Sequence, residues 1–462
     1  MTVPGLSAAL LTILIAGLGA TLVASHGQRR VNLAEICALS WFFGTGVISL
    51  LLWVGGMFLT GAALQGFVTS LALGLGAFGF IRARKKRMRA VIPPPSNAAE
   101  WILAVTIALQ FAVMLYLSFS SGLGWDGLLN WEIKARYAFL NNGVMPAAYF
   151  SDASRDFTHQ AYPLWIPLTE LWLYLWMGEA HQFWLKLLFV LFYVAGAILL
   201  ITLASRLTSR RWIGLLTAAL LFFVPCLTAM PGGAPVGYVD VPIGMLYMAA
   251  IGYLLLAAER NDPFCWRTYA LCLALLPWAK REGAVLWAIA ALCGIPVMWR
   301  TRRLRPALLW LLPGPAIMLA WKAFYFSMGK TDELEFLPMT LATLVKNFPR
   351  ASSIGRSVIV EMMDAKHWSI LWPLTAAVFL WLLLRARGRR LLILFLAVSA
   401  PLFIDTSMYL FSGWPNWTAH VEQSLSRLLL QVMPVMWLAI ALALRPPELC
   451  PDWLCSPTAS DI

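Results

Sequence analysis

The chain has 462 residues, of which 60% are hydrophobic and 12% are charged, and its mean hydropathy is +0.74. Soluble domains carry about 25% charged residues, so this composition excludes a water-soluble surface for most of the chain and predicts a polytopic membrane protein. The net charge of +13 does not indicate nucleic-acid binding, because the basic residues form short clusters between apolar stretches, where orientation in a membrane explains them.

Thirteen apolar stretches are long enough, or nearly so, for a helix of about 20 residues that crosses a membrane. They cover residues 4–24, 38–58, 61–81, 101–121, 181–205, 212–230, 238–258, 266–279, 283–299, 307–328, 368–384, 391–411 and 427–444. The sequence therefore predicts an all-α polytopic membrane protein with about 13 transmembrane helices and further juxtamembrane or amphipathic helices in its outer loops. We expect the first stretch to be retained as a span, since it lacks the features of a cleaved signal peptide.

Basic clusters separate these stretches and indicate their orientation. They lie at residues 28–30, 82–89, 206–211, 260–267, 300–305 and 385–390. If each cluster is cytoplasmic, the spans alternate without violation, and the two long loops at 122–180 and 329–367 lie outside. The second of these loops predicts amphipathic helices that cover a site or rest on the membrane. This arrangement predicts a multi-pass protein of the bacterial inner (plasma) membrane, with its site facing the periplasm.

Three further expectations concern organisation. The apolar segment 164–177 is too short for a span, so we expect a juxtamembrane or re-entrant helix with Trp165, Trp172 and Trp176 at headgroup depth. Residues 1–90 form a three-helix N-terminal extension and residues 91–462 form the core, with a hinge near 91–97. The seven cysteines show no metal-ligand spacing, so neither zinc nor a disulfide framework is expected; Cys450 and Cys455 are expected to be unpaired thiols.

The first outer loop begins with the sequence GWDGLLNWEIKARYAF. Asp126 follows directly after a span, and partial burial there suits a carboxylate to act as a general base, because it raises the pKa toward neutral pH. Asp126 can instead be the N-cap of the helix that the apolar spacing predicts. Glu132 lies on that helix, either in ion pairs with Lys134 and Arg136 or in contact with a phosphate or sugar.

His159 and Tyr162 close the loop in the sequence HQAYP, where they serve either a site or the local structure. The next outer turn reads GYVDVP and places Asp240 two residues after Tyr238, at the start of a span. A buried carboxylate needs a cation, a metal or a proton, so Asp240 is either a site residue or the cap of the span.

Positive charge in the outer turn WAKREG is contrary to the usual bias. Lys280 and Arg281 therefore indicate an anionic ligand such as a lipid phosphate or pyrophosphate, unless they pair internally with Glu282. His420 and Arg427 stand before or at the last span, where Arg427 binds a substrate phosphate or extends to lipid headgroups.

The order of these motifs from about residue 101 onward resembles the membrane glycosyltransferases of the GT-C superfamily. It is most similar to the protein mannosyltransferase and lipid A aminoarabinose transferase-like branches. The resemblance rests on the acidic first loop, on HQAYPLWIPL where that family has an H-x-x-YPPL-like stretch, and on YVDVP, KREG and SLSRLLLQVMP in the same order. This chain has YPLW in place of YPPL and lacks a clear DxD motif, and the three leading spans lie outside the resemblance.

The resemblance implies an inverting transferase that moves a sugar from a polyprenyl-phosphate donor to a hydroxyl of a glycan, lipid or protein acceptor at the outer membrane surface. Asp126 would be the catalytic base and Asp240 a second acidic residue, with His159, Tyr162, Glu132 and Tyr238 as substrate contacts. Lys280, Arg281, Arg427 and His420 would face the donor phosphate, so no cofactor is expected and a divalent metal, although possible, is not indicated. Membrane lipids are the other expected partners.

Two other functions fit the same architecture. A lipid-linked polysaccharide polymerase or O-antigen ligase would depend on outer-face Arg and His more than on two carboxylates. A lipid flippase or secondary transporter would show related halves and ionisable residues in the middle of its spans.

Overall fold

The computed structural model describes residues 2–91, 93–230, 232–301, 309–328, 335–385 and 389–445. Within these ranges ten helices are long and apolar enough to cross a membrane. They are α1 (Thr2–Ala24), α2 (Leu33–Gly55), α3 (Gly61–Lys85), α4 (Ala98–Ser120), α8 with α9 (Gln182–Leu185, Leu187–Thr208), α12 (Asp240–Arg260), α14 (Glu282–Arg300), the helical stretch Leu309–Ser327 that contains α16 (Pro313–Ser327), α21 (Arg389–Ser407) with η4 (Met408–Phe411), and α22 (Trp417–Ala443). An all-α membrane protein is therefore confirmed.

The predicted number of 13 spans is not confirmed. Three of the predicted stretches form shorter helices of 11, 17 and 15 residues: α10 (Arg211–Leu221), α13 (Pro263–Ala279) and α20 (Leu371–Arg385). The stretch 212–230 breaks after Leu221, and α11 (Pro225–Thr228) begins at a proline, which has no N–H to continue the first helix.

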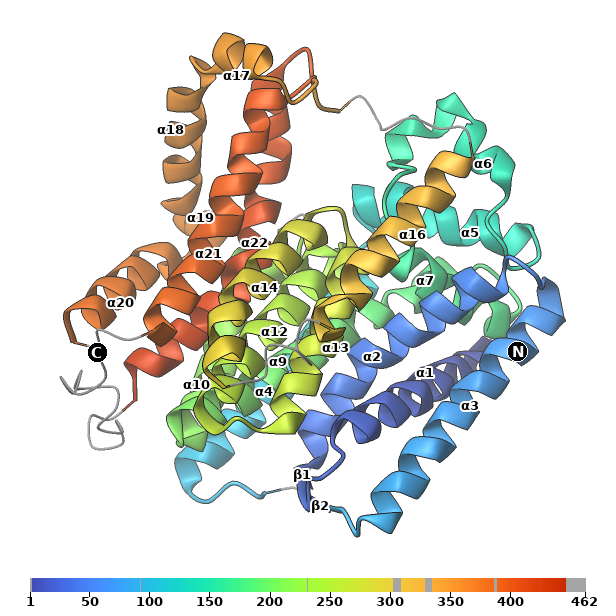
Figure 1. The fold of residues 1–462 in the computed structure, drawn as a ribbon, viewed down its shortest axis with the longest axis horizontal. Coiled ribbons are helices and arrows are strands. Elements are labelled where there is room, and N and C mark those ends of the chain that lie inside the picture. The colour runs from blue at the N-terminus through green and yellow to red at the C-terminus, as the bar shows by residue number, and fades with distance from the viewer. Residues whose placement is uncertain are drawn as a thin grey trace.

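The remaining elements are short and connect the long helices. They are β1 (Arg30–Asn32), β2 (Arg89–Val91), η1 (Gly127–Glu132), α5 (Ile133–Leu140), α6 (Ala147–Ser151), η2 (Ala153–Thr158), α7 (Trp165–Met177), η3 (Ala234–Val236), α17 (Leu341–Asn347), α18 (Arg350–Met362) and α19 (Ala365–Trp368). The two strands form a small parallel sheet. Helices are found in the second long loop, as predicted, and α18 runs alongside α21 and α22 (Figure 1).

The helix bundle has two chemically different ends. At one end, which we call the basic end, α1, α3, α9 and α12 finish, and Arg206 Nη1 bonds Glu35 Oε1 at 2.7 Å while Arg267 Nη1 bonds the His26 carbonyl at 2.7 Å. At the opposite end, which we call the loop end, α5, α6 and α17 lie (Figure 1). Here the Gly124 amide donates to the Val236 carbonyl at 2.8 Å, which joins the loop that follows α4 to the turn that precedes α12.

The three N-terminal helices form a compact group. A Cβ atom on Gly17 would lie 1.7 Å from the Ser40 carbonyl oxygen, and one on Gly44 would lie 2.0 Å from the Ile13 carbonyl oxygen. Glycines thus let the backbones of α1 and α2 touch, which is how helices commonly associate in membranes. This group also packs against α7, α9 and α13.

Within segment 164–177, residues Trp165–Met177 form α7, and two of its tryptophans are enclosed by the protein. Trp165 and Trp172 are fully buried, and their indole N–H groups donate to Thr45 Oγ1 at 3.2 Å and to Thr12 Oγ1 at 2.9 Å. The indole groups need partners inside the protein because α7 lies against α1, α2 and α5. These two side chains therefore contact protein, and the headgroup depth of α7 stays a prediction.

Candidate functional site

Asp126 lies at the start of an irregular helix. The chain that follows forms the π-helical turn η1 and then α5, and π-helical turns are frequent at functional sites. The Asp126 side chain makes no capping hydrogen bond; its Oδ2 accepts a short hydrogen bond from Arg427 Nη2. The N-cap alternative for Asp126 is thus excluded. Its side chain is 8% exposed, so the carboxylate faces a guanidinium with little access to solvent.

Asp240 is completely buried in the first turn of α12. Its Oδ1 accepts from Lys280 Nζ at 2.9 Å and from Gln431 Nε2 at 2.7 Å, and its Oδ2 accepts from Arg427 Nε at 3.1 Å. Since Val239 and not Asp240 precedes the helix, capping does not explain this carboxylate. Two cations and an amide compensate the cost of burying its charge.

Lys280 joins a further carboxylate to this arrangement. Its Nζ lies 3.0 Å from Glu282 Oε1, and the side chain is 3% exposed. Burial alone would lower the pKa of Lys280, but the charges of Asp240 and Glu282 raise it overall, so the ammonium form is stabilised. We call Asp126, Asp240, Lys280, Glu282 and Arg427 the buried ion network.

The buried ion network reaches the surface at Glu282, whose side chain is 20% exposed, and at its arginine. The Arg427 side chain is 19% exposed, and its Cζ lies 4.9 Å from the centroid of the Tyr238 ring. This is the geometry of a cation–π contact. One guanidinium thus bridges Asp126 and Asp240 and keeps an accessible edge.

A second group of charges lies beside the buried ion network, and we call His159, Arg281, Glu335 and His420 the rim cluster. His159 Nδ1 lies 2.9 Å from Glu335 Oε1, and Arg281 Nη1 lies 3.5 Å from Glu335 Oε2. Burial alone would raise the pKa of Glu335, but these neighbours and His420 lower it overall. Arg281 and the two histidine side chains therefore stabilise the ionised form of the Glu335 carboxyl.

Aromatic rings support the rim cluster. The Tyr162 ring stacks on His159 with a centroid distance of 5.0 Å and on Trp131 at 5.7 Å, and Arg281 Cζ lies 5.6 Å from it. Burial, followed by the charges of nearby carboxylates, raises the pKa of Tyr162 well above its usual range. Tyr162 is consequently a neutral phenol at physiological pH. His420 has its own support: its ring stacks on Trp414 at 4.7 Å, and its Nδ1 lies 2.9 Å from Ser412 Oγ.

Glu132 is bonded away from both groups of charges. Its Oε1 accepts from Arg136 Nη2 at 2.7 Å and from the Tyr174 hydroxyl at 2.8 Å. Lys134, on the same helix, donates to the His159 carbonyl at 2.8 Å. Of the two roles considered for Glu132, the ion pair is therefore the one observed, and Lys134 supports the backbone beneath the rim cluster.

Three polar residues at this end were not predicted. Gln431 lies one helical turn after Arg427, a spacing that places both on one face of α22 and could have revealed it. Glu335 gave no local signal, because its partners are far away in the sequence. Asp405 on α21 is 8% exposed and within electrostatic range of Lys280 and Glu282.

The site has the chemistry to handle an anionic substrate at the loop end. Its carboxylates can accept protons, and the exposed edges of Arg281 and Arg427 can neutralise a phosphate. Over the described ranges, no three His, Cys, Asp or Glu side chains come together as a metal-binding group. Five cysteines in these ranges are free thiols, whereas Cys450 and Cys455 lie outside the described residues.

Comparison of the chain with protein-family models, with curated proteins and with solved structures gives no match. The geometry of the buried ion network and the rim cluster is therefore the basis on which a function can be argued.

Proposed function

We propose that the protein is an inverting glycosyltransferase that moves a sugar from a polyprenyl-phosphate donor to an acceptor hydroxyl at the loop end. One observation carries this proposal. Asp126 and Asp240 both accept hydrogen bonds from Arg427, and Lys280 donates to Asp240, although Asp126, Asp240 and Lys280 come from three separate loops or turns. The resemblance to GT-C enzymes assigns Asp126 as the base, Asp240 as a second acidic residue, and Lys280 and Arg427 to the donor phosphate.

The reaction needs a base on one side of the anomeric carbon and a cation near the leaving group. Asp126 accepts the proton of the acceptor hydroxyl, whose oxygen forms a bond to the anomeric carbon. The bond between that carbon and the phosphate oxygen breaks, and its electron pair leaves with the lipid phosphate. A single displacement in line with the leaving group inverts the anomeric configuration.

Arg427 can link the two halves of this reaction. While Asp126 is ionised, it shares the guanidinium with Asp240. When Asp126 takes up a proton, its attraction for Arg427 weakens, and the guanidinium becomes available to the negative charge that develops on the phosphate. Arg281, with 31% of its side chain exposed, lies closer to solvent and is suited to hold the phosphate on arrival.

The proposed membrane position follows from the apolar helices and the basic clusters. We place the loop end at the periplasmic face of a bacterial inner membrane, because the basic end then faces the cytoplasm. The lipid tail of the donor would lie between helices while its phosphate and sugar reach the loop end. The acceptor is a glycan, lipid or protein hydroxyl.

Sugar transfer in proteoliposomes tests the proposal. Wild-type protein is given a panel of polyprenyl-phosphate sugars, with and without a chelator, and compared with Asp126→Asn at equal folded yield. Removing a general base lowers the rate by about two or more orders of magnitude. Asp152→Asn is the matched control, since Asp152 is a 42% exposed carboxylate in the same loop that pairs with Arg155. No transfer from any donor would refute the activity, and a fully active Asp126→Asn would refute the role of Asp126.

The rim cluster favours a second candidate, a lipid-linked polysaccharide ligase or polymerase. Such an enzyme would use outer-face Arg and His, and His159, Arg281 and His420 surround Glu335. The same assay separates the two candidates when Arg281→Gln is added and the donor carries a long polyprenyl-pyrophosphate glycan. Transfer of the whole glycan that depends on Arg281 but not on Asp126 identifies the ligase.

A further inference from the structure

The basic end contains two adjoining pockets that the proposed reaction does not use. The first has a volume of about 660 Å³ and the second about 700 Å³. Lys85 and Lys86, at and just past the end of α3, line both of them. The first pocket is completed by His26, Phe78, Ile81 and Arg82, and the second by Gly27, Gln28, Arg29, Arg30, Arg87 and Arg89.

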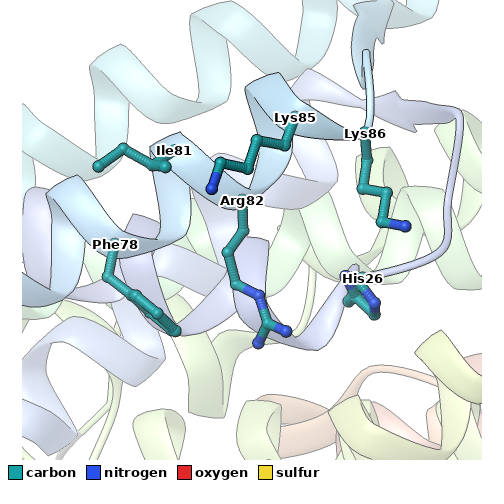
Figure 2. Close-up of a pocket in the computed structure, with 6 residues that line it drawn as sticks. All are labelled: His26, Phe78, Ile81, Arg82, Lys85 and Lys86. Carbon is teal, nitrogen blue, oxygen red and sulfur yellow. The ribbon is translucent and has the colours of Figure 1, made fainter.

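The pockets are built by segments that are distant in the sequence. Strand β1 follows α1 and pairs in parallel with β2, which follows α3, so that Arg30 stands opposite Arg89. Like charges opposite each other destabilise a strand pair unless an anion lies between or near them. In Figure 2, Arg82 and Lys86 extend from α3 on the side of His26.

The basic residues that line these pockets form no ion pair with a described carboxylate, and the lining contacts Asp262 through the neutral Gln28, whose Nε2 donates to Asp262 Oδ1 at 2.7 Å. Other basic side chains at this end do form ion pairs with carboxylates: Arg206 pairs with Glu35, and Arg390 pairs with Glu259. Within the described part of the chain, no ion pair joins a carboxylate to any basic residue that lines the pockets. Partial burial and then the charges of Arg82, Lys86 and Arg267 lower the pKa of His26, as expected in an uncompensated positive field.

The residues that line the pockets favour a lipid over a soluble anion as the ligand. Phe78 lies two turns and Ile81 one turn before Lys85 on α3, and both residues are 51% exposed. An apolar face that continues into lysines and arginines suits a molecule with acyl chains and a phosphate headgroup. Orientation in the membrane accounts for positive charge at this end but not for two concave pockets that share two lysines.

We propose that the two pockets bind the phosphate headgroup of an anionic phospholipid from the leaflet at the basic end. Lys85 and Lys86 contact the phosphate, Arg82 and the arginines of β1 and β2 contribute to its binding, and Phe78 with Ile81 contacts the acyl chains. This site is separate from the buried ion network, so the lipid-binding proposal can be tested independently of the proposed transferase activity.

Native mass spectrometry of the full chain released from detergent micelles measures the binding. Phosphatidylglycerol and phosphatidylcholine with identical acyl chains are titrated against the wild type and against the variant Arg82→Gln, Lys85→Gln, Lys86→Gln. Each Lys or Arg near an anionic lipid surface contributes on the order of fivefold in affinity. We expect the wild type to prefer phosphatidylglycerol by at least about fivefold, and the triple variant to lose that preference.

Two controls make the result specific. The variant Arg84→Gln, Arg210→Gln, Arg300→Gln removes the same charge from exposed positions at the same end that do not line the pockets, and it should keep the preference. Lys85→Arg with Lys86→Arg keeps the charge and should also bind. Equal loss in the control triple variant would overturn the proposal, as would displacement of the lipid by inorganic phosphate at constant ionic strength.

Discussion

The two ends of the bundle use charge in opposite ways. At the loop end, carboxylates and cations from distant segments are buried and bonded to each other, as in the contacts of Asp240 with Lys280 and Arg427. At the basic end, Lys85 and Lys86 are exposed and make no ion pair with a described carboxylate. Paired buried charges fix the geometry of a site, whereas unpaired exposed charges leave binding capacity for a ligand. Substitutions at the two ends should therefore affect different properties.

The largest difference is expected when a charge is removed from the buried ion network. Asp240→Asn leaves Lys280 without its closest carboxylate in a fully buried position, which costs about 3–5 kcal/mol of unfolding free energy. The measurement is SDS-induced unfolding in mild detergent. Asp240→Asn combined with Lys280→Met removes one charge of each sign and should recover part of the loss. If the double variant is less stable than the single one, the pair does not act as a unit.

The next prediction concerns Glu170, a buried carboxyl group that, unlike Asp240, has no cation bonded to it. Glu170 on α7 is fully buried, and neither of its oxygens has a hydrogen-bond partner. Burial, followed by the charge of Glu132, raises the pKa of Glu170 well above its usual 4.5, although Lys134 acts in the opposite direction. The folded protein then holds a proton that the unfolded chain releases above pH 4.5, so stability falls as the pH rises above that value.

Replacing that carboxyl removes the pH dependence. Each pH unit above 4.5 costs up to about 1.4 kcal/mol while Glu170 stays protonated in the folded state. Glu170→Gln should therefore gain stability relative to the wild type between pH 6 and pH 8. The apparent melting temperatures of both proteins across this range provide the measurement, and parallel profiles would contradict the expectation.

The smallest effect is expected at the basic end. Lys85→Gln removes an exposed charge that has no described carboxylate partner, so the unfolding free energy should change by no more than about 0.5 kcal/mol. The same unfolding assay, run beside Asp240→Asn, shows whether the contrast between the ends holds. A loss comparable to that of Asp240→Asn would mean that Lys85 is part of the folded framework.

Hydropathy predicted most of the membrane helices because the requirement is local. A backbone in lipid must satisfy its own hydrogen bonds, so a long apolar stretch becomes a helix whatever its neighbours are. Breaks inside such stretches were not predicted. Apolar composition continues from Leu221 through Pro225, but the helix ends between them. Likewise α19 ends at Trp368 with the following residue, Ser369, at a φ of 52°, before α20 begins.

The candidate site was predictable where a residue was unusual in its own surroundings. Asp240 beside a span and Lys280 in a turn predicted to be outer are both exceptions to the rules that place charges in membrane proteins. The contacts between site residues were harder to predict from the sequence, because the partners are far apart in it. Asp126 and Arg427, for example, are 301 positions apart. Glu335 is an ordinary loop residue until the fold brings it to His159.

The separation of Asp126 and Arg427 in the sequence has a consequence for biosynthesis. Asp126 precedes it by 301 residues, and at roughly 5–20 residues per second the ribosome needs about 15–60 s to reach the arginine. During this interval Asp126 has no guanidinium, and Asp240 has only Lys280 for a cation. Insertion of α22 is thus the step that balances the charges of the loop end, and a nascent chain that lacks this helix should be open to quality-control proteases there.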